Sequence, residues 1–279
     1  MTTISASLVN ELRQKTSSGM MECKKALTES HGDLEKAVEI LRLKGQLSAA
    51  KRADRSATEG FMATKVSADN KKAALIQLNC ETDFVSRNEN FQAFANQVAD
   101  LVLSSGVENL DQLLAATLGS QNVSDALTQL NATIGEKIES GQAAFRSAPT
   151  GYIQPYIHAG SRLGVLLVLD QASAADTEIV KDLAMQIAAA SPLYVGPENV
   201  PAELKAKELG FIREQLKTEG KPEAMLAKIA EGKINKYYTD ICLLKQAFVK
   251  NPDMSVEKHL GAAAPKVKVA DFVRFAISK

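Results

Sequence analysis

Residues 60–78 read GFMATKVSADNKKAALIQL, in which two apolar runs flank a polar turn at residues 69–72. Residues 151–169, about 91 positions further along, read GYIQPYIHAGSRLGVLLVL and repeat this arrangement around a turn at residues 160–162. Short apolar runs bounded by turn-forming residues indicate β-strands. The sequence therefore predicts two similar strand pairs, one in each half of the chain.

A helix is predicted after each strand pair. The apolar residues at helical spacing are Phe94, Ala95, Val98 and Ala99 in the first half, and Leu183, Ala184, Ile187 and Ala188 in the second. Two strands and a helix, present twice, predict an α+β fold with a duplicated core and antiparallel sheets. We expect the first core half to span residues 61–145 and the second to span residues 146–279.

Three short helices are predicted in residues 1–45. Their apolar stripes are Ile4, Leu8 and Leu12, then Met20, Cys23 and Leu27, and finally Leu34, Ala37, Val38 and Leu41. We expect Asp33 to cap the third helix and Gly45 to end it. A bundle this small would be marginally stable alone, so we expect an attached binding module. Residues 46–60, which are polar and rich in charge, are expected to form a linker.

Three further segments complete the predicted organisation. Residues 107–140 have moderate helical periodicity. Residues at about 201–238 predict a protruding antiparallel helical hairpin of the coiled-coil kind, broken near residues 218–222. The hairpin seam contains Ala202, Leu209, Ile212, Leu216, Met225 and Ile229. Val267, Val269, Val273, Phe275 and Ile277 alternate with other residues, which predicts a final strand that joins the second sheet.

Composition excludes several classes of protein. The 279 residues carry 33 basic and 33 acidic side chains, so the net charge is zero and no nucleic-acid partner is expected. No apolar run reaches the roughly 20 residues of a membrane span, and the N-terminus has no basic leader, so we expect a cytoplasmic protein without a membrane partner. The three cysteines are odd in number and far apart, which predicts no disulfide framework.

The sequence predicts no catalytic, cofactor-binding or metal-binding site. It contains neither GxxxxGK[ST] nor GxGxxG, the loops that cradle phosphates, and its three histidines lack ligand spacing. One enzymatic alternative is a hydrolase in which Cys80 is the nucleophile, with His158 as the base and Asp83 as the orienting acid. However, Cys80 directly follows an apolar strand, where a free cysteine is more often a small buried hydrophobe.

The segment NCETDFVSRN, residues 79–88, is harder to explain by packing alone. A strand ends near Leu78, and a large aromatic residue beside an acid then follows in a polar turn. In a purely structural interpretation, Phe84 is a hydrophobic staple for the helix beginning near Glu89, and Asp83 is a capping residue. In a functional interpretation, both side chains contact a partner.

Four blocks in order along the chain make the sequence resemble the elongation factor Ts family. These are SSGMMECKKAL at 17–27 with GDLEKAVEILR at 32–42, NCETDFVSRNENF at 79–91, HAGSRLGVLL at 158–167 and FVRF at 272–275. The resemblance implies a guanine-nucleotide exchange factor of translation elongation, which is not an enzyme. Its partner would be elongation factor Tu in the GDP form.

The resemblance also implies which residues contact that partner. Thr82, Asp83, Phe84 and Val85 would displace Mg²⁺ and perturb the phosphate site, with Phe84 as a wedge between helices of the partner. The first three helices would be a ubiquitin-associated-like bundle that docks through Met20, Met21 and Lys24. Periodicity places Met20 in the bundle core instead. His158 would be a further contact, and a solvated turn histidine is the alternative.

Two questions stay open at this stage. The helical hairpin would, by the same resemblance, either touch the partner or pair two subunits, so a homodimer is a further expectation. An adaptor, whose N-terminal bundle recognises ubiquitin-like folds, is the alternative function, and it would not accelerate GDP release.

Overall fold

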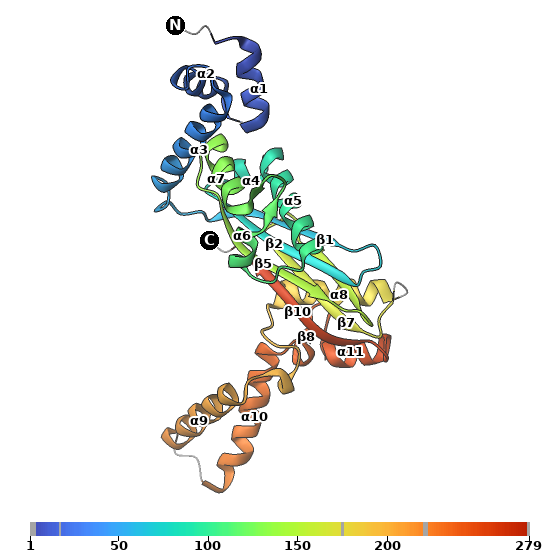
Figure 1. Ribbon diagram of the computed structural model, residues 1–279. Helices are drawn as coiled ribbons and strands as arrows, with labels where there is room; N and C mark the ends of the chain where they lie inside the picture. The colour runs from blue at the N-terminus through green and yellow to red at the C-terminus, as the bar shows by residue number, and fades with distance from the viewer. Residues whose placement is uncertain (1–3, 17, 174–175, 220–222, 278–279) are drawn as a thin grey trace.

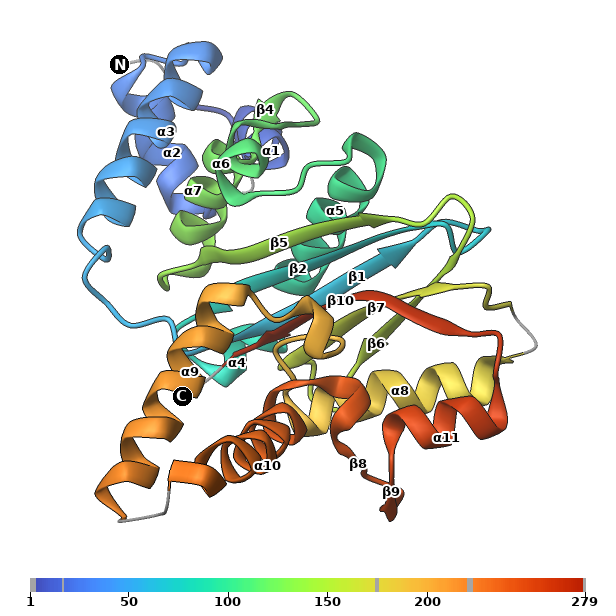
Figure 2. The ribbon, with the colours of Figure 1, turned by 90° about the horizontal axis from the view of Figure 1, so that it is seen from below.

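The computed structural model describes residues 4–16, 18–173, 176–219 and 223–277, with residues 223–227 described by their backbone alone. The core consists of two three-stranded antiparallel sheets stacked face to face, with helices on both outer faces (Figures 1 and 2). The first sheet has the order β1–β2–β5, formed by Glu59–Val66, Lys72–Cys80 and Glu139–Ser147. The second has the order β10–β7–β6, formed by Lys268–Ala276, Leu163–Asp170 and Tyr152–Ile157.

The central strands are apolar throughout because both of their faces are covered. In β2, Ala73 and Leu75 pack between the two sheets, whereas Ile76 and Leu78 pack under the helices of the first half. In β7, Leu166 likewise lies between the sheets. These continuous apolar runs are typical of strands buried on both faces. The strand pairs β1–β2 and β6–β7, and the union of β10 with the second sheet, confirm the prediction of a duplicated α+β core.

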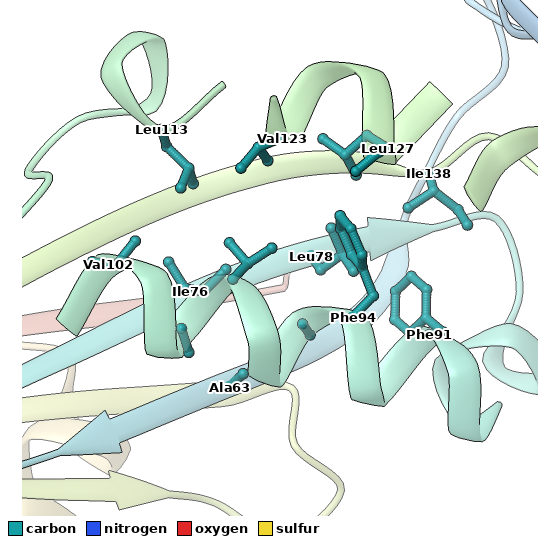
Figure 3. Packing of buried hydrophobic residues seen from close by; sticks show 14 of the residues in the cluster. Ala63, Ile76, Leu78, Phe91, Phe94, Val102, Leu113, Val123, Leu127 and Ile138 are labelled. Atoms are coloured by element: carbon teal, nitrogen blue, oxygen red, sulfur yellow. The ribbon is translucent and has the colours of Figure 1, made fainter. Parts of the chain in front are cut away.

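Helices cover the outer face of each sheet. The first sheet is covered by α5 (Glu89–Ser105), α6 (Leu110–Ala115) and α7 (Val123–Ile134), and the second by α8 (Thr177–Ala190) and α11 (Val256–Ala263). Figure 3 shows Phe91, Phe94 and Val102 of α5 on the side of the helix that faces β2. A short hairpin of β3 (Thr117–Leu118) and β4 (Gln121–Asn122) connects α6 to α7, and a second hairpin of β8 (Ala247–Phe248) and β9 (Asn251–Ser255) precedes α11.

The sequence predicts no strand at the position of β5, whose first two residues fall in the segment predicted to be helical, residues 107–140. Its sequence, ESGQAAFRS, contains Gly, Ser, Gln and Arg, and along it only Ala144 is fully buried. An edge strand with one well-packed face leaves only a weak alternation in the sequence, and its partner β2 determines where it lies. The predicted helical region therefore ends at α7, and the third strand of the first sheet follows it.

The N-terminal bundle consists of α1 (Ala6–Thr16), α2 (Met20–Glu29) and α3 (Leu34–Ala50), as the three helical stripes predict. Asp33 caps α3 as expected, accepting a hydrogen bond from the Lys36 amide at 3.1 Å. Gly45 does not end α3, which continues to Ala50. A Cβ atom at Gly45 would lie 3.5 Å from the Cβ of Ala132, so the glycine marks the close approach of α3 to α7.

A helical hairpin, which we call the arm, comprises α9 (Ala202–Thr218) and α10 (Glu223–Ile241). It projects from the end of the molecule opposite the N-terminal bundle (Figure 1). Ile212 and Leu216 are buried in the seam with Ala230 and Ile234, as the heptad spacing predicts for α9. Ala202 is exposed, and the side chain of Met225 lies outside the described residues. At the base of the arm, short helical turns occupy Pro197–Asn199 and Leu243–Lys245.

Among the described residues, no helix is both long and apolar enough to cross a membrane.

Candidate functional site

A single helical turn, α4 (Asp83–Ser86), connects β2 to α5, and we call residues 82–85 the tip. Thr82 caps α4, because its hydroxyl accepts a hydrogen bond from the Val85 amide at 3.4 Å. Asn88 caps α5 directly afterwards, accepting from the amides of Asn90 at 3.0 Å and Phe91 at 3.3 Å. Two capping residues six positions apart break the helical path twice. The chain therefore forms a projecting corner between strand and helix.

Phe84 points away from the protein at this corner, and its side chain is 83% exposed. Val85, the next residue, is half-buried and packs against the core of the first half. The interpretation of Phe84 as a hydrophobic staple is therefore wrong, since Val85 makes the packing contact. An aromatic ring of this size gains most of its burial energy only if another molecule covers it.

Asp83 forms an exposed ion pair with Arg87, with 3.0 Å between Oδ2 and the guanidinium nitrogen. Exposed pairs of this kind contribute at most about 1 kcal/mol, so a competing cation or amide donor can displace Arg87 at little cost. The tip thus presents an aromatic ring and a carboxylate side by side.

Glu136, which precedes β5, lies at the base of the tip. Its Oε2 atom accepts hydrogen bonds from the amides of Glu81 at 3.1 Å and Thr82 at 3.0 Å, and its Oε1 atom accepts from the Thr82 hydroxyl at 2.7 Å. Sequence reasoning missed this residue, because a contact across 54 positions leaves no local pattern. Only the pairing of β2 with β5 brings it there.

Cys80 is buried and cannot act as the proposed nucleophile. Its thiol donates to the Thr82 carbonyl at 3.2 Å, and burial, reinforced by the negative charge of Glu136, raises its pKa to about 12. A reactive cysteine requires the opposite, a pKa lowered toward neutrality. The Nδ1 atom of His158 lies 2.9 Å from the Tyr156 hydroxyl, whereas the partner of the Cys80 thiol is the Thr82 carbonyl. The described residues therefore show no hydrogen bond between Cys80 and His158.

His158 is exposed in the turn between β6 and β7, in the second core half. The same turn is joined to the first half: the Met62 amide donates to the Ser161 carbonyl at 2.8 Å, and Arg162 forms an ion pair with Glu59. Glu59 lies opposite Cys80 in the β1–β2 ladder, two residues before the tip begins. His158 and the tip therefore lie at the same end of the molecule.

The remaining predicted contacts lie at the start of α2. Met20 is 52% exposed and Met21 is 64% exposed, and Lys24 is also exposed. The placement of Met20 in the bundle core by periodicity is wrong, since Met20 is the first residue of α2 and only Cys23 and Leu27 of its stripe are buried. Helix α2 lies well apart from α4 in both views (Figures 1 and 2).

Comparison with known proteins identifies relatives over almost the whole chain. The family described as "Elongation factor TS" matches residues 81–279. The protein named elongation factor Ts of Chlorobaculum parvum is 46% identical over 284 aligned residues, which cover 99% of each chain. The elongation factor Ts of Clostridium perfringens strain SM101 is 46% identical over 98% of this chain and 92% of its own. That of Chlorobaculum tepidum is 45% identical over 99% of both.

Proposed function

The chain belongs to the elongation factor Ts family, and on that premise we propose that it binds elongation factor Tu in the GDP form and accelerates GDP release. It is an elongation factor of protein synthesis and not an enzyme. The exposure of Phe84 at the end of a short capped corner is the observation that supports this mechanism. An aromatic ring held out in this way is suited to insertion between elements of another protein.

In the proposed mechanism the tip acts on the groups that hold the nucleotide. Phe84 inserts between helices of the partner's nucleotide-binding domain, while Asp83 exchanges Arg87 for a partner group. Metal and phosphate contacts depend on placement to about 1 Å, so displacing the elements that position Mg²⁺ weakens both. GDP then leaves a site in which its negative charge is less well compensated.

Energetic considerations require more than one contact. A thousandfold acceleration corresponds to about 4 kcal/mol of barrier reduction. Burying one Phe side chain supplies about 2 to 3 kcal/mol, so Phe84 is insufficient alone. We assign the remainder to Met20, Met21, Lys24 and His158. The coupling must also be reciprocal: GDP weakens binding of this chain by the same factor by which the chain weakens binding of GDP.

The domain division follows the same proposal. The predicted bundle at residues 1–45, whose last helix continues to Ala50, docks on the partner. The rest of the predicted linker at 46–60 joins it to the core, and the halves at 61–145 and 146–279 hold the tip and His158. We propose that the exchange reaction involves no nucleic acid, consistent with the net charge of zero. The arm provides either a second partner contact or the surface for a homodimer.

One kinetic experiment tests the proposal. Elongation factor Tu is loaded with a fluorescent GDP analogue, and release into excess unlabelled GDP is followed in a stopped-flow instrument at increasing concentrations of this chain. We expect the release rate to rise and saturate, and a rate independent of the chain would refute the proposal. The adaptor alternative predicts no acceleration of GDP release, and sedimentation with elongation factor Tu measures binding separately.

Native thiol labelling tests the hydrolase alternative separately. With a pKa of about 12, the Cys80 thiol is ionised to roughly one part in 10⁴ at pH 8. We therefore expect Cys80 to react with a maleimide only after unfolding, as judged by mass spectrometry of a tryptic digest. Labelling of Cys80 in the native chain within seconds would instead support a catalytic cysteine.

A further inference from the structure

Two glutamates interlock beneath the tip. Glu136 accepts three hydrogen bonds from Glu81 and Thr82, at 2.7–3.1 Å. Glu81 reciprocates, because its Oε1 atom accepts the Lys137 amide at 2.5 Å. Each carboxylate thus binds the backbone of the segment that carries the other. We call Glu81 and Glu136 the lock.

The lock begins where the sheet ends. The last backbone pair of the β2–β5 ladder joins Asn79 to Glu139, and Cys80 is paired only with Glu59 of β1, so the residues that follow Cys80 have no strand partner to orient them. Helix α7 ends at Ile134, and Gly135 adopts a left-handed φ of 88°, which turns the chain back toward β2. The two carboxylates then take the place of backbone pairing between the diverging segments.

The tip has little else to hold its orientation. Helix α4 is four residues long and contains no fully buried residue, and a helix of one turn is unstable unless its surroundings fix it. Phe84 is largely exposed, so packing of its ring contributes little to the orientation of the tip. The half-buried Val85 and the hydrogen bond from the Gln92 side chain to the Ser86 carbonyl, at 3.0 Å, hold the far side. The near side is held by the lock and by the hydrogen bond from the Cys80 thiol to the Thr82 carbonyl, at 3.2 Å.

The lock is also joined to the linker that follows the N-terminal bundle. Arg55 donates from one guanidinium nitrogen to both carboxylate oxygens of Glu81, at 3.2 and 3.3 Å. Lys137 donates in turn to the Arg55 carbonyl at 3.0 Å. Arg55 therefore compensates part of the negative charge of two neighbouring carboxylates. It also attaches the linker at the point where the tip begins.

We propose that Glu136 and Glu81 are positioning residues for nucleotide exchange: they hold the tip in the orientation that the partner accepts and tie it, through Arg55, to the N-terminal bundle. This inference rests on the proposed function. When a tip samples several orientations, only the fraction of molecules in the right orientation binds productively. The apparent affinity is then the intrinsic affinity multiplied by that fraction. The rate within the assembled complex depends on Phe84 and changes less.

The test uses full-length Glu136→Gln in the fluorescent-GDP assay. The amide of Gln keeps one acceptor oxygen but turns an NH₂ group toward groups that are themselves donors, so at least one charged hydrogen bond is lost. We expect the concentration of chain giving half-maximal release to rise about tenfold, and the plateau rate to stay within about threefold. Glu108→Gln, which removes the same charge from an exposed loop, is the matched control and should behave as the wild type.

A double variant separates positioning from general damage. If Glu136 acts by orienting the tip, Glu136→Gln should change half-saturation less than about twofold when Phe84 is already Ala, since the group being oriented is gone. The inference would be overturned if Glu136→Gln raised the half-saturation concentration equally with Phe84 and with Ala at position 84. It would also be overturned if Glu136→Gln left half-saturation at the wild-type value. Should Glu136→Gln fail to fold, Arg55→Gln replaces it, because Arg55 is exposed. We expect Arg55→Gln to raise the half-saturation concentration about threefold, and an unchanged concentration would overturn the tie to the linker.

Hydrogen exchange distinguishes failure of this inference from failure of the proposed function. The amides of Glu81 and Thr82 should exchange faster in Glu136→Gln than in the wild type, whether or not the chain releases GDP from any partner. A wild-type chain that releases no GDP refutes the proposed function. If the wild type accelerates GDP release but the Glu81 and Thr82 amides are equally protected in the wild type and in Glu136→Gln, the lock alone is refuted.

Discussion

Phe84 and Val85 are neighbours in the sequence but lie in different surroundings, one exposed and the other half-buried against the core. Phe84→Ala should therefore change the free energy of unfolding by less than about 0.5 kcal/mol, as for most exposed substitutions. Loss of a wedge that contributes about 2 kcal/mol should slow GDP release about thirtyfold at the plateau. Stopped-flow release and denaturant unfolding of the same preparation measure both quantities.

Leu103→Ala, at a half-buried position near the end of α5 that is away from the tip, is the control for this prediction. Removing part of a half-buried side chain should lower stability by about 1 kcal/mol while leaving the exposed ring in place. If Phe84→Ala instead destabilised the fold and left GDP release unchanged, the ring would be a structural residue and the tip would need another role.

Glu81 makes the stability of the lock dependent on pH. The Lys137 amide, followed by Arg55, lowers the pKa of this carboxyl below its ordinary value of 4.5. A depressed folded-state pKa stabilises the fold fully above the unfolded value, and the contribution is lost as pH falls through the folded value. The difference in unfolding free energy between the wild type and Glu81→Gln should therefore be constant above about pH 6 and shrink below pH 4.5. Denaturant titrations at pH 7, 5, 4 and 3 measure it, and a difference that persists undiminished at pH 3 would contradict the prediction.

Residue by residue, the sequence reveals the exposed half of the site better than its support. A Phe beside an Asp in a polar segment is visible as an anomaly, and it marks the tip. Glu136 is an ordinary acid in its own neighbourhood, and only the three-dimensional pairing of β2 with β5 gives it a role. The prediction that Met20 is buried is wrong for a different reason: a helical stripe does not indicate which of its residues is the first to be buried.

At the scale of elements, prediction succeeds where burial dominates the sequence. Strands β2 and β7 are covered on both faces, so their apolar runs are unmistakable. Strand β5 lies at a sheet edge with a half-buried polar sequence and leaves no comparable pattern. Glycine is ambiguous in the same way, because Gly45 could end a helix or allow two helices to approach.

Gly45 offers a direct test of the contact between α3 and α7. A Cβ atom there would meet Ala132 at 3.5 Å, an ordinary contact, so Gly45→Ala should be tolerated and should gain up to about 1 kcal/mol of helix propensity. Gly45→Leu adds atoms that have no room beside Ala132 and Thr128 and should destabilise the fold by about 1 to 3 kcal/mol.

The control for helix propensity lies in the arm. A Cβ atom at Gly210 of α9 would meet no other described side chain within 4 Å, so Gly210→Leu should be neutral or stabilising. Thermal unfolding of the three variants separates the two effects. Equal behaviour of Gly45→Leu and Gly210→Leu would mean that the N-terminal bundle does not pack on α7 in solution.

At the scale of the whole molecule, the proposed contacts are spread along its length. The N-terminal bundle lies at one end, the tip projects from the core, and the arm leaves from the other end (Figure 1). The base of the arm is fixed to the core, because the Leu243 amide donates to the Tyr194 carbonyl at 2.9 Å and the Leu193 amide to the Ile241 carbonyl at 2.8 Å. Such an arrangement allows binding energy gained far from the nucleotide to support the work of the tip.

The arm should therefore affect association without affecting the exchange step. Phe211, on α9, is 68% exposed and is the largest apolar side chain that the described part of the arm presents to solvent. We expect Phe211→Ser to leave the plateau rate of GDP release within about twofold of the wild type, because the tip and its support are untouched. Sedimentation velocity of the wild type and the variant, alone and with elongation factor Tu, shows which interface contains Phe211. A lower mass of the variant alone assigns Phe211 to a homodimer interface. An unchanged mass with weaker binding of elongation factor Tu assigns Phe211 to the contact with that partner. A plateau reduced as far as in Phe84→Ala would show instead that the arm takes part in opening the nucleotide site, and the division of labour between the arm and the tip would be wrong.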